Sequence, residues 1–98
     1  MRAAVRELNK RIKETPLAYL HAKNKLDMNI AFQGRLIEAE QSARETLNES
    51  IGLTGKASGT TADCIINLGE ILLMQGRLVD SEKLLRKGVF LFEESRYC

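Results

Sequence analysis

Histidine and cysteine would carry metal binding or proton transfer near neutral pH, and this sequence holds few of them. His21 is the one histidine, and no second histidine or cysteine stands near it at the spacing of metal ligands. Cys64 and Cys98 are too far apart for a metal knuckle and too few for a disulfide framework. We therefore predict no metal site and no cofactor, with His21 on a surface or groove, two free thiols, and Cys64 buried as a small core residue.

Two further patterns have the residue types of an active site without its spacing. Segment 52–58, Gly-Leu-Thr-Gly-Lys-Ala-Ser, has a misplaced first glycine for a phosphate-binding loop, lacks Ser or Thr directly after its lysine, and follows no predicted strand. We interpret it as a linker. Four glutamates recur around one predicted helix beside Arg44, which is typical of a solvated face: Glu38, Glu40, Glu45 and Glu49. We predict no catalytic residues.

Basic residues are concentrated in the first quarter of the chain, at Arg2, Arg6, Lys10, Arg11, Lys13, Lys23 and Lys25. Lysine and arginine bind phosphate, but the nearest aromatic side chain is Tyr19, so stacking on bases has little support. Fifteen basic and thirteen acidic residues give a net charge of +2, too near balance to indicate nucleic acid or an anionic membrane. A solvated helix face or an acidic partner is the favoured interpretation.

Length and hydropathy set the class of protein. The 98 residues, 44% of them hydrophobic, suit one globular domain spanning 1–98. No apolar run approaches the roughly 20 residues needed to cross a bilayer, and charges interrupt residues 1–8, where a signal peptide needs an apolar stretch. We expect a cytoplasmic protein with no membrane association.

The sequence repeats itself at a distance of 42 residues. Segment 33–40, Gln-Gly-Arg-Leu-Ile-Glu-Ala-Glu, recurs as Gln-Gly-Arg-Leu-Val-Asp-Ser-Glu at 75–82. The match continues outside these octets, pairing Ala22 with Cys64, Leu26 with Leu68, Ile30 with Leu72, Arg44 with Arg86 and Leu47 with Val89. Similarity at a fixed period indicates a repeat architecture whose unit is longer than the octet.

Apolar residues within each unit recur at steps of three and four, which predicts helices. Gly34 and Gly76 each follow such a run and can adopt the left-handed conformation that closes a helix. Thr15 before Pro16 suits a helix start, and Thr60 is a weaker start signal. We predict no strands, and helices at 2–14, 16–33, 36–52, 60–75 and 78–96. This gives a lone helix followed by hairpins 16–52 and 60–96.

These features resemble the tetratricopeptide repeat (TPR) family in its long-period form, as in kinesin light chain and many bacterial regulators. The later unit fits the family's large and small positions at Ile65, Leu68, Gly69, Leu72, Gly76, Leu78, Ser81, Leu85 and Gly88. The earlier unit departs from them at Lys23 and Asp27, where the family has a large apolar and a small residue. The resemblance covers roughly 16–96. It implies an all-α fold of antiparallel helical hairpins stacked as a short right-handed solenoid of about two and a half repeats, either complete or part of a longer array.

The resemblance also implies a function, because this family binds an extended or helical peptide in a groove along the first helices of its hairpins. The corresponding positions here are His21, Asn24, Met28, Phe32, Asp63, Ile66, Asn67, Glu70 and Met74. The expected function is a protein–protein interaction module that binds a peptide or a partner domain, and not an enzyme. Met28, Phe32 and Met74 are also compatible with core positions. Asn24 and Ile66 replace the lysine of the subfamily that clamps a C-terminal carboxylate, which disfavours that specialisation.

Two alternative functions stay open from the sequence. One is the regulatory or sensing repeat segment of a larger bacterial transcription activator or peptidase, which the lone helix at 2–14 favours. The weaker one is a nucleic-acid-binding helical repeat, in which the basic first helix and the groove would act together.

The last predicted helix is apolar around more than one turn, at Val89, Phe90, Leu91 and Phe92. One hairpin can cover only one side of this helix, and repeat proteins normally add a polar capping helix at such a place. We therefore predict exposed apolar surface here and a homodimer through helix 78–96, formed by Val89, Phe90 and Phe92, most simply with two-fold symmetry.

Overall fold

Four α-helices make up most of residues 15–96, the part of the chain that the computed structural model describes. They are α2 (Pro16–Phe32), α3 (Leu36–Thr54), α4 (Gly59–Met74) and α5 (Leu78–Arg96), and this part contains no strand. The four helices predicted there all occur, with ends shifted by two residues or fewer. The all-α fold class is confirmed. The predicted helix 2–14 lies outside the described residues.

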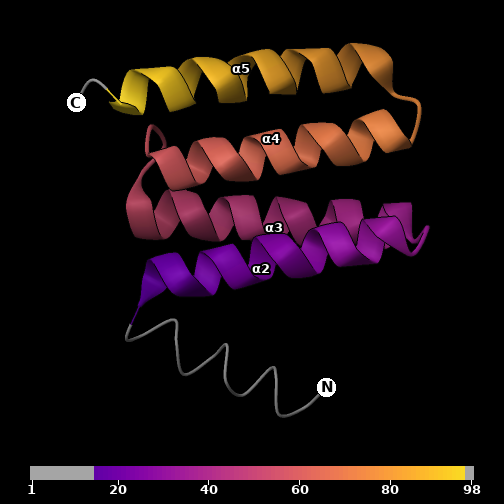
Figure 1. Cartoon of the computed structure of the whole chain (residues 1–98), viewed down its shortest axis with the longest axis horizontal. Helices are drawn as coiled ribbons and strands as arrows, with labels where there is room; N and C mark the ends of the chain where they lie inside the picture. Colours follow the sequence, from indigo (N-terminus) through magenta and orange to yellow (C-terminus); the bar gives the residue numbers. More distant parts are fainter. Residues whose placement is uncertain (1–14, 97–98) are drawn as a thin grey trace.

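Helices that follow one another in the chain lie side by side (Figure 1). α3 packs between α2 and α4, and α5 packs on α4. The first helices of the two hairpins, α2 and α4, also have Cα atoms within 8 Å of each other, whereas the backbones of α3 and α5 lie farther apart. The Cα atoms extend 37 × 37 × 15 Å, so the helices form a slab. One side of it is therefore a surface shared by α2 and α4.

The two glycine turns have nearly the same geometry. Gly34 and Gly76 have φ of 84° and 81°, in the left-handed region that glycine adopts without strain. The amide of Gly34 donates to the carbonyl of Ala31, and that of Gly76 to Leu73, both at 2.9 Å. The sequence prediction that these glycines close the first helix of each hairpin is confirmed.

The start of α4 differs from the prediction, since Ser58 and not Thr60 caps the helix. The Ser58 hydroxyl oxygen accepts a hydrogen bond from the Thr61 backbone amide at 3.0 Å, which satisfies one of the free donors of the first turn. The Ser58 and Thr61 hydroxyls also contact Thr54 at the end of α3. At the other predicted start, Pro16 occupies the first turn of α2 but the Thr15 side chain forms no capping hydrogen bond.

The core that joins the two hairpins is small and lies between α2, α3 and α4. It contains Ala31 of α2, Ala39 and Ala43 of α3, and Leu68 and Ile71 of α4, all buried. Alanines on α3 let α4 approach closely, and the larger side chains of α4 fill the space. The helices of one unit are thus held by the helix of the next.

Equivalent positions inside the two hairpins carry side chains of different size. A Cβ at Gly69 would lie 2.9 Å from Cδ2 of Leu85 and 3.4 Å from Cβ of Leu84, so α4 and α5 are in close contact there. Asp27 stands 42 residues before Gly69 and is fully buried. It accepts hydrogen bonds from Ser42, which stands 42 residues before Leu84, and from Thr46. In the first hairpin, therefore, Asp27 on α2 is larger than its equivalent Gly69. Ser42 on α3 is smaller than its equivalent Leu84, and it is polar.

Replacing Gly69 by Leu should destabilise the protein by about 1–3 kcal/mol, because the new side chain overpacks the contact with Leu85. Gly52→Leu is the matched control: Gly52 is exposed on α3 with open space around its Cα, and leucine is the better helix former by up to about 1 kcal/mol. Urea unfolding of both variants measures the difference. Equal stability of the two variants would place Gly69 outside the helix interface.

Asp27 should make stability depend on pH. Its burial raises the pKa of this carboxyl, against the opposing effect of the Ser42 and Thr46 hydrogen bonds. The folded state therefore holds the proton more tightly than the unfolded state, and the stability from this group is full below the ordinary aspartate pKa and lost as the pH rises through the raised one. An Asp27→Asn variant keeps the shape and can still pair with both hydroxyls. Its free energy of unfolding relative to wild type should increase as the pH is raised above about 4 in urea titrations. A constant difference would show that Asp27 titrates normally.

Candidate binding groove

An open hollow of about 450 Å³ lies on the side shared by α2 and α4. We name it the α2–α4 hollow. Six of its lining residues come from α2 and three from α4: His21, Asn24, Lys25, Met28, Asn29, Phe32, Asp63, Ile66 and Asn67. Neither hairpin forms it alone, so it exists because the two repeat units are stacked.

Most of the groove residues predicted from the sequence are brought together in this hollow. Glu70 and Met74 are the exceptions: both are exposed on α4 but do not line it. Two lining residues were missed, Lys25 and Asn29. They follow His21 at steps of four, so the helical spacing that gave the other positions could have identified them as the same edge of α2.

The apolar part of the hollow is solvent-facing. Phe32 is 71% exposed and Met74 is also exposed, so the interpretation of these two side chains as core is wrong. Met28 is half-buried, lining the hollow while packing against the core cluster. Ile66 is half-buried on the opposite wall. An exposed phenylalanine beside two half-buried apolar side chains provides contact area for a ligand.

Three asparagines line the hollow at different depths. Asn24 is buried near the thiol of Cys64 and favours its ionised form, and Cys64 is buried as predicted. Burial nevertheless raises the pKa of Cys64. Asn29 is exposed and Asn67 half-buried, and no hydrogen bond within residues 15–96 occupies either side-chain amide. Each of these two amides offers donors and an acceptor to a ligand.

The charges around the hollow are mixed. His21 and Lys25 lie on α2, and Asp63 lies opposite them on α4. Within the described part of the chain, no three side chains of His, Cys, Asp or Glu are grouped so that they could hold a metal ion. The hollow thus combines hydrogen-bonding groups, apolar surface and charges of both signs. The basic residues at 2–13 lie outside the described residues.

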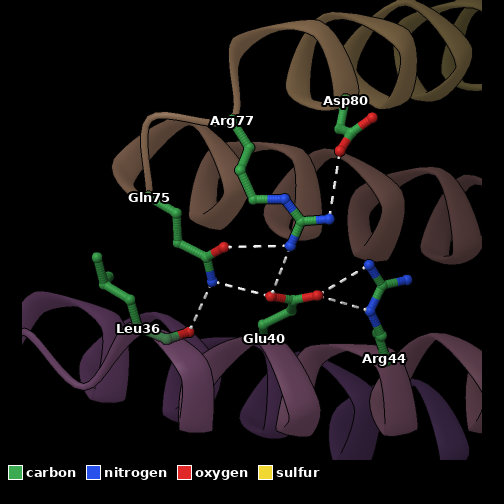
Figure 2. A network of polar contacts seen from close by, with 6 residues as sticks. All are labelled: Leu36, Glu40, Arg44, Gln75, Arg77 and Asp80. Carbon is green, nitrogen blue, oxygen red and sulfur yellow. Dashed lines mark hydrogen bonds and ion pairs between the residues drawn. The ribbon is translucent and has the colours of Figure 1, made fainter.

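A polar network fixes the second unit on the first (Figure 2). The Gln75 amide donates to the Leu36 carbonyl at 3.1 Å and to Glu40 Oε1 at 2.9 Å. Arg77 also donates to Glu40 Oε1, at 3.0 Å, and Arg44 pairs with Glu40 Oε2 at 2.9 Å. The hydrogen bond from Gln75 and the neighbouring arginines hold the pKa of Glu40 below its ordinary value. The network sets the distance between α3 and the α4–α5 turn, and thereby the position of α4 beside α2.

The prediction of a wholly solvated glutamate face on α3 is wrong at two positions. Glu40 has only 17% of its side chain exposed because it sits in this network. Glu49 accepts a hydrogen bond from the buried Tyr19 of α2. Burial and this bond raise the pKa of Tyr19. The two glutamates connect α3 to its neighbours on both sides.

The residues predicted for self-association are exposed on α5. Val89, Phe90 and Phe92 are all among the exposed large apolar residues, which confirms the predicted apolar surface. A hollow of about 400 Å³ lies there, lined by Leu85, Arg86, Val89, Phe90 and Glu93. Pairing of two chains through this surface stays a prediction.

Comparison with known proteins leaves the site to be interpreted from its own chemistry. No protein-family model, curated protein or solved structure matches this chain. Among residues 15–96, no helix combines the length and apolar character needed to span a membrane.

Gln75→Ala should lower the free energy of unfolding by about 1–3 kcal/mol, because the carbonyl of the half-buried Leu36 and the carboxylate of Glu40 each lose one hydrogen bond. The repeat supplies a matched control in Gln33→Ala, at the equivalent but exposed position of the first turn, where a change within about 0.5 kcal/mol is expected. Urea unfolding at low micromolar protein concentration compares the two. If both variants were equally stable, the network would not be what fixes the second unit.

Proposed function

We propose that the protein is a protein–protein interaction module that binds a peptide segment of a partner in the α2–α4 hollow. The observation that carries this proposal is the pair of accessible asparagine amides, Asn29 on α2 and Asn67 on α4, on opposite walls of one open hollow. An enzyme would need reactive groups placed together, whereas these residues provide recognition.

Peptide is the ligand class that such a pair suits best. A side-chain amide offers both a donor and an acceptor, the same pair that each peptide unit of an extended chain presents. Asparagine amides on the two walls of the hollow can therefore bind the backbone of a peptide whatever the side chains of that peptide are. Phe32, Met28 and Ile66 then provide apolar surface for one or two ligand side chains. Selectivity would come from those contacts.

Charge gives the bound peptide a preferred direction. Lys25 on α2 attracts an acidic group of the ligand, and Asp63 on α4 attracts a basic one. Glu70 is exposed one turn beyond Ile66 on α4 and adds to the acidic wall. A peptide carrying both signs of charge fits this arrangement better than a uniformly basic or acidic one.

The proposed architecture is a TPR-like right-handed solenoid, with the peptide along the surface of its first helices. Three observations support it: the 42-residue repeat, the matching glycine turns, and the close approach of the backbone of α2 to that of α4 but not of α3 to α5. An enzymatic role is disfavoured, because the raised pKa of the buried Cys64 works against a reactive thiolate. The sensing alternative depends on the helix 2–14, which lies outside the described residues.

Peptides selected from a displayed random library on the whole protein provide the test. Asn67→Ala should weaken their binding about tenfold or more in fluorescence anisotropy, because both hydrogen bonds to the ligand backbone are lost. Asn48→Ala is the matched control: Asn48 is exposed on α3, away from the hollow, and its replacement should leave binding unchanged. Circular dichroism should show equal helicity in both variants. Selected peptides that bind the Asn67→Ala protein at wild-type strength would overturn the proposed site.

A further inference from the structure

The ion pairs of the first unit recur in the second. Arg44 pairs with Glu40 at 2.9 Å, and 42 residues later Arg86 pairs with Glu82 at 2.7 Å. Likewise, Arg35 pairs with Glu38, and Arg77 with Asp80. Each unit therefore has the same two ion pairs at the start of its second helix.

In the first unit, the surface around these ion pairs is covered by the second unit. Gln75 and Arg77 contact Glu40 (Figure 2), which keeps 17% of its side chain exposed. Leu36 packs against the core cluster. In the second unit the equivalent Glu82 and Leu78 are each 62% exposed. Val89, equivalent to the half-buried Leu47, is 49% exposed. We name Leu78, Glu82 and Val89 the α5 acceptor face, since it is the surface of α3 repeated without its cover.

The matching donor is exposed at the other end of the protein. Gln33 and Arg35 stand 42 residues before Gln75 and Arg77, around a glycine of nearly equal φ. The contact of the arginine Nη1 with the glutamine Oε1 also recurs, at 3.4 Å in the first turn and 3.3 Å in the second. Both Gln33 and Arg35 are exposed, and among residues 15–96 neither contacts another unit. The donor turn is already in the conformation that binds Glu40 elsewhere in the same molecule.

We propose that a second copy of this chain docks its Gln33–Arg35 turn on the α5 acceptor face, head to tail. Gln33 would donate to the Leu78 carbonyl and to Glu82, and Arg35 would pair with Glu82, as Gln75 and Arg77 do with Leu36 and Glu40. The charges are complementary. Leu26 of the second copy, equivalent to Leu68 and partly exposed, brings apolar surface to α5 where Leu68 meets α3. This docking is a separate proposal from peptide binding, but it would cover Asn29 of the α2–α4 hollow, because Asn29 stands 42 residues before Ile71, which is fully buried against α3.

The symmetry of this contact differs from that of the two-fold dimer predicted from the sequence. A two-fold interface uses the same patch on both copies and stops at two. The head-to-tail contact joins two different patches, so each added copy presents a new acceptor face and assembly continues with concentration. The two arrangements therefore give different masses and respond differently to a change in the donor turn.

Two variants of the whole chain test the proposal by sedimentation velocity from low to high micromolar concentration. The donor variant is Gln33→Ala with Arg35→Ala, and the acceptor variant is Glu82→Lys. Wild type should rise in mass beyond a dimer. Each variant alone should need about tenfold or more protein for the same association, because one side of the charged contact is missing. Mixed in equal amounts, the variants should form a 1:1 pair that grows no further, since only one wild-type contact remains available.

Glu45→Lys, an equal charge change at an exposed position of α3, should assemble like wild type. Recovery of association in the mixture also shows that both variants are folded. If Glu82→Lys loses helicity, Leu78→Ser replaces it as the acceptor variant. A wild type that stays monomeric throughout overturns the proposal. So does a wild type that stops at a dimer while the donor variant dimerises equally well, which is the result expected for two-fold pairing through Val89, Phe90 and Phe92.

Discussion

Ala39 and Ala43 of α3 leave room for Leu68 and Ile71 of α4, and this contact makes one structure of two hairpins. A single helical hairpin buries one face of each helix, so its remaining apolar face requires a neighbour. Here the neighbour is the first helix of the next unit. The polar network around Glu40 lies at the end of the same interface and fixes its register, because the donors Gln75 and Arg77 stand directly after α4. The α2–α4 hollow is a consequence of this register.

Helix positions, turns and most of the hollow could be predicted from the sequence, because each depends on a local pattern. Gly34 and Gly76 follow apolar periods, and the 42-residue match assigned the positions along α2 and α4 in pairs. Asp27 could not be interpreted in this way. In the sequence it is only a departure from the repeat pattern. The hydrogen bonds from Ser42 and Thr46 that explain it depend on tertiary contact. Glu40 likewise has the sequence surroundings of a solvated residue, and its partners across the interface, Gln75 and Arg77, are 35 and 37 residues away.

The two units have helices of similar length and the same glycine turn, but different interiors. In the second, Gly69 and Gly88 admit Leu85 and Ile66, and the contact is apolar. In the first, hydroxyl groups surround a buried carboxylate, and Tyr19 reaches Glu49. Within the described residues every fully buried side-chain nitrogen or oxygen has a hydrogen-bond partner, so the polar interior is satisfied. Its cost is sensitivity to pH through Asp27, whereas the equivalent Gly69 of the second hairpin has no titratable side chain.

The repeat also separates two kinds of exposed apolar residue. Ile37 and Val79 occupy equivalent positions and are both largely exposed. This position is therefore exposed in each unit, whether or not another unit packs on it. Leu36 and Leu78 are also equivalent, yet only Leu78 is exposed, and the difference between them is the helix that covers α3 and does not cover α5. Phe90 is different again, since its equivalent, Asn48, is polar. The exposure of Leu78 thus reports an uncovered repeat interface, whereas the position of Phe90 is exposed in both units and only its apolar side chain is particular to the second. The two surfaces lie on one helix and share Val89, but Leu78 and Glu82 belong only to the repeat interface, and Phe90 and Phe92 only to the patch predicted for two-fold pairing.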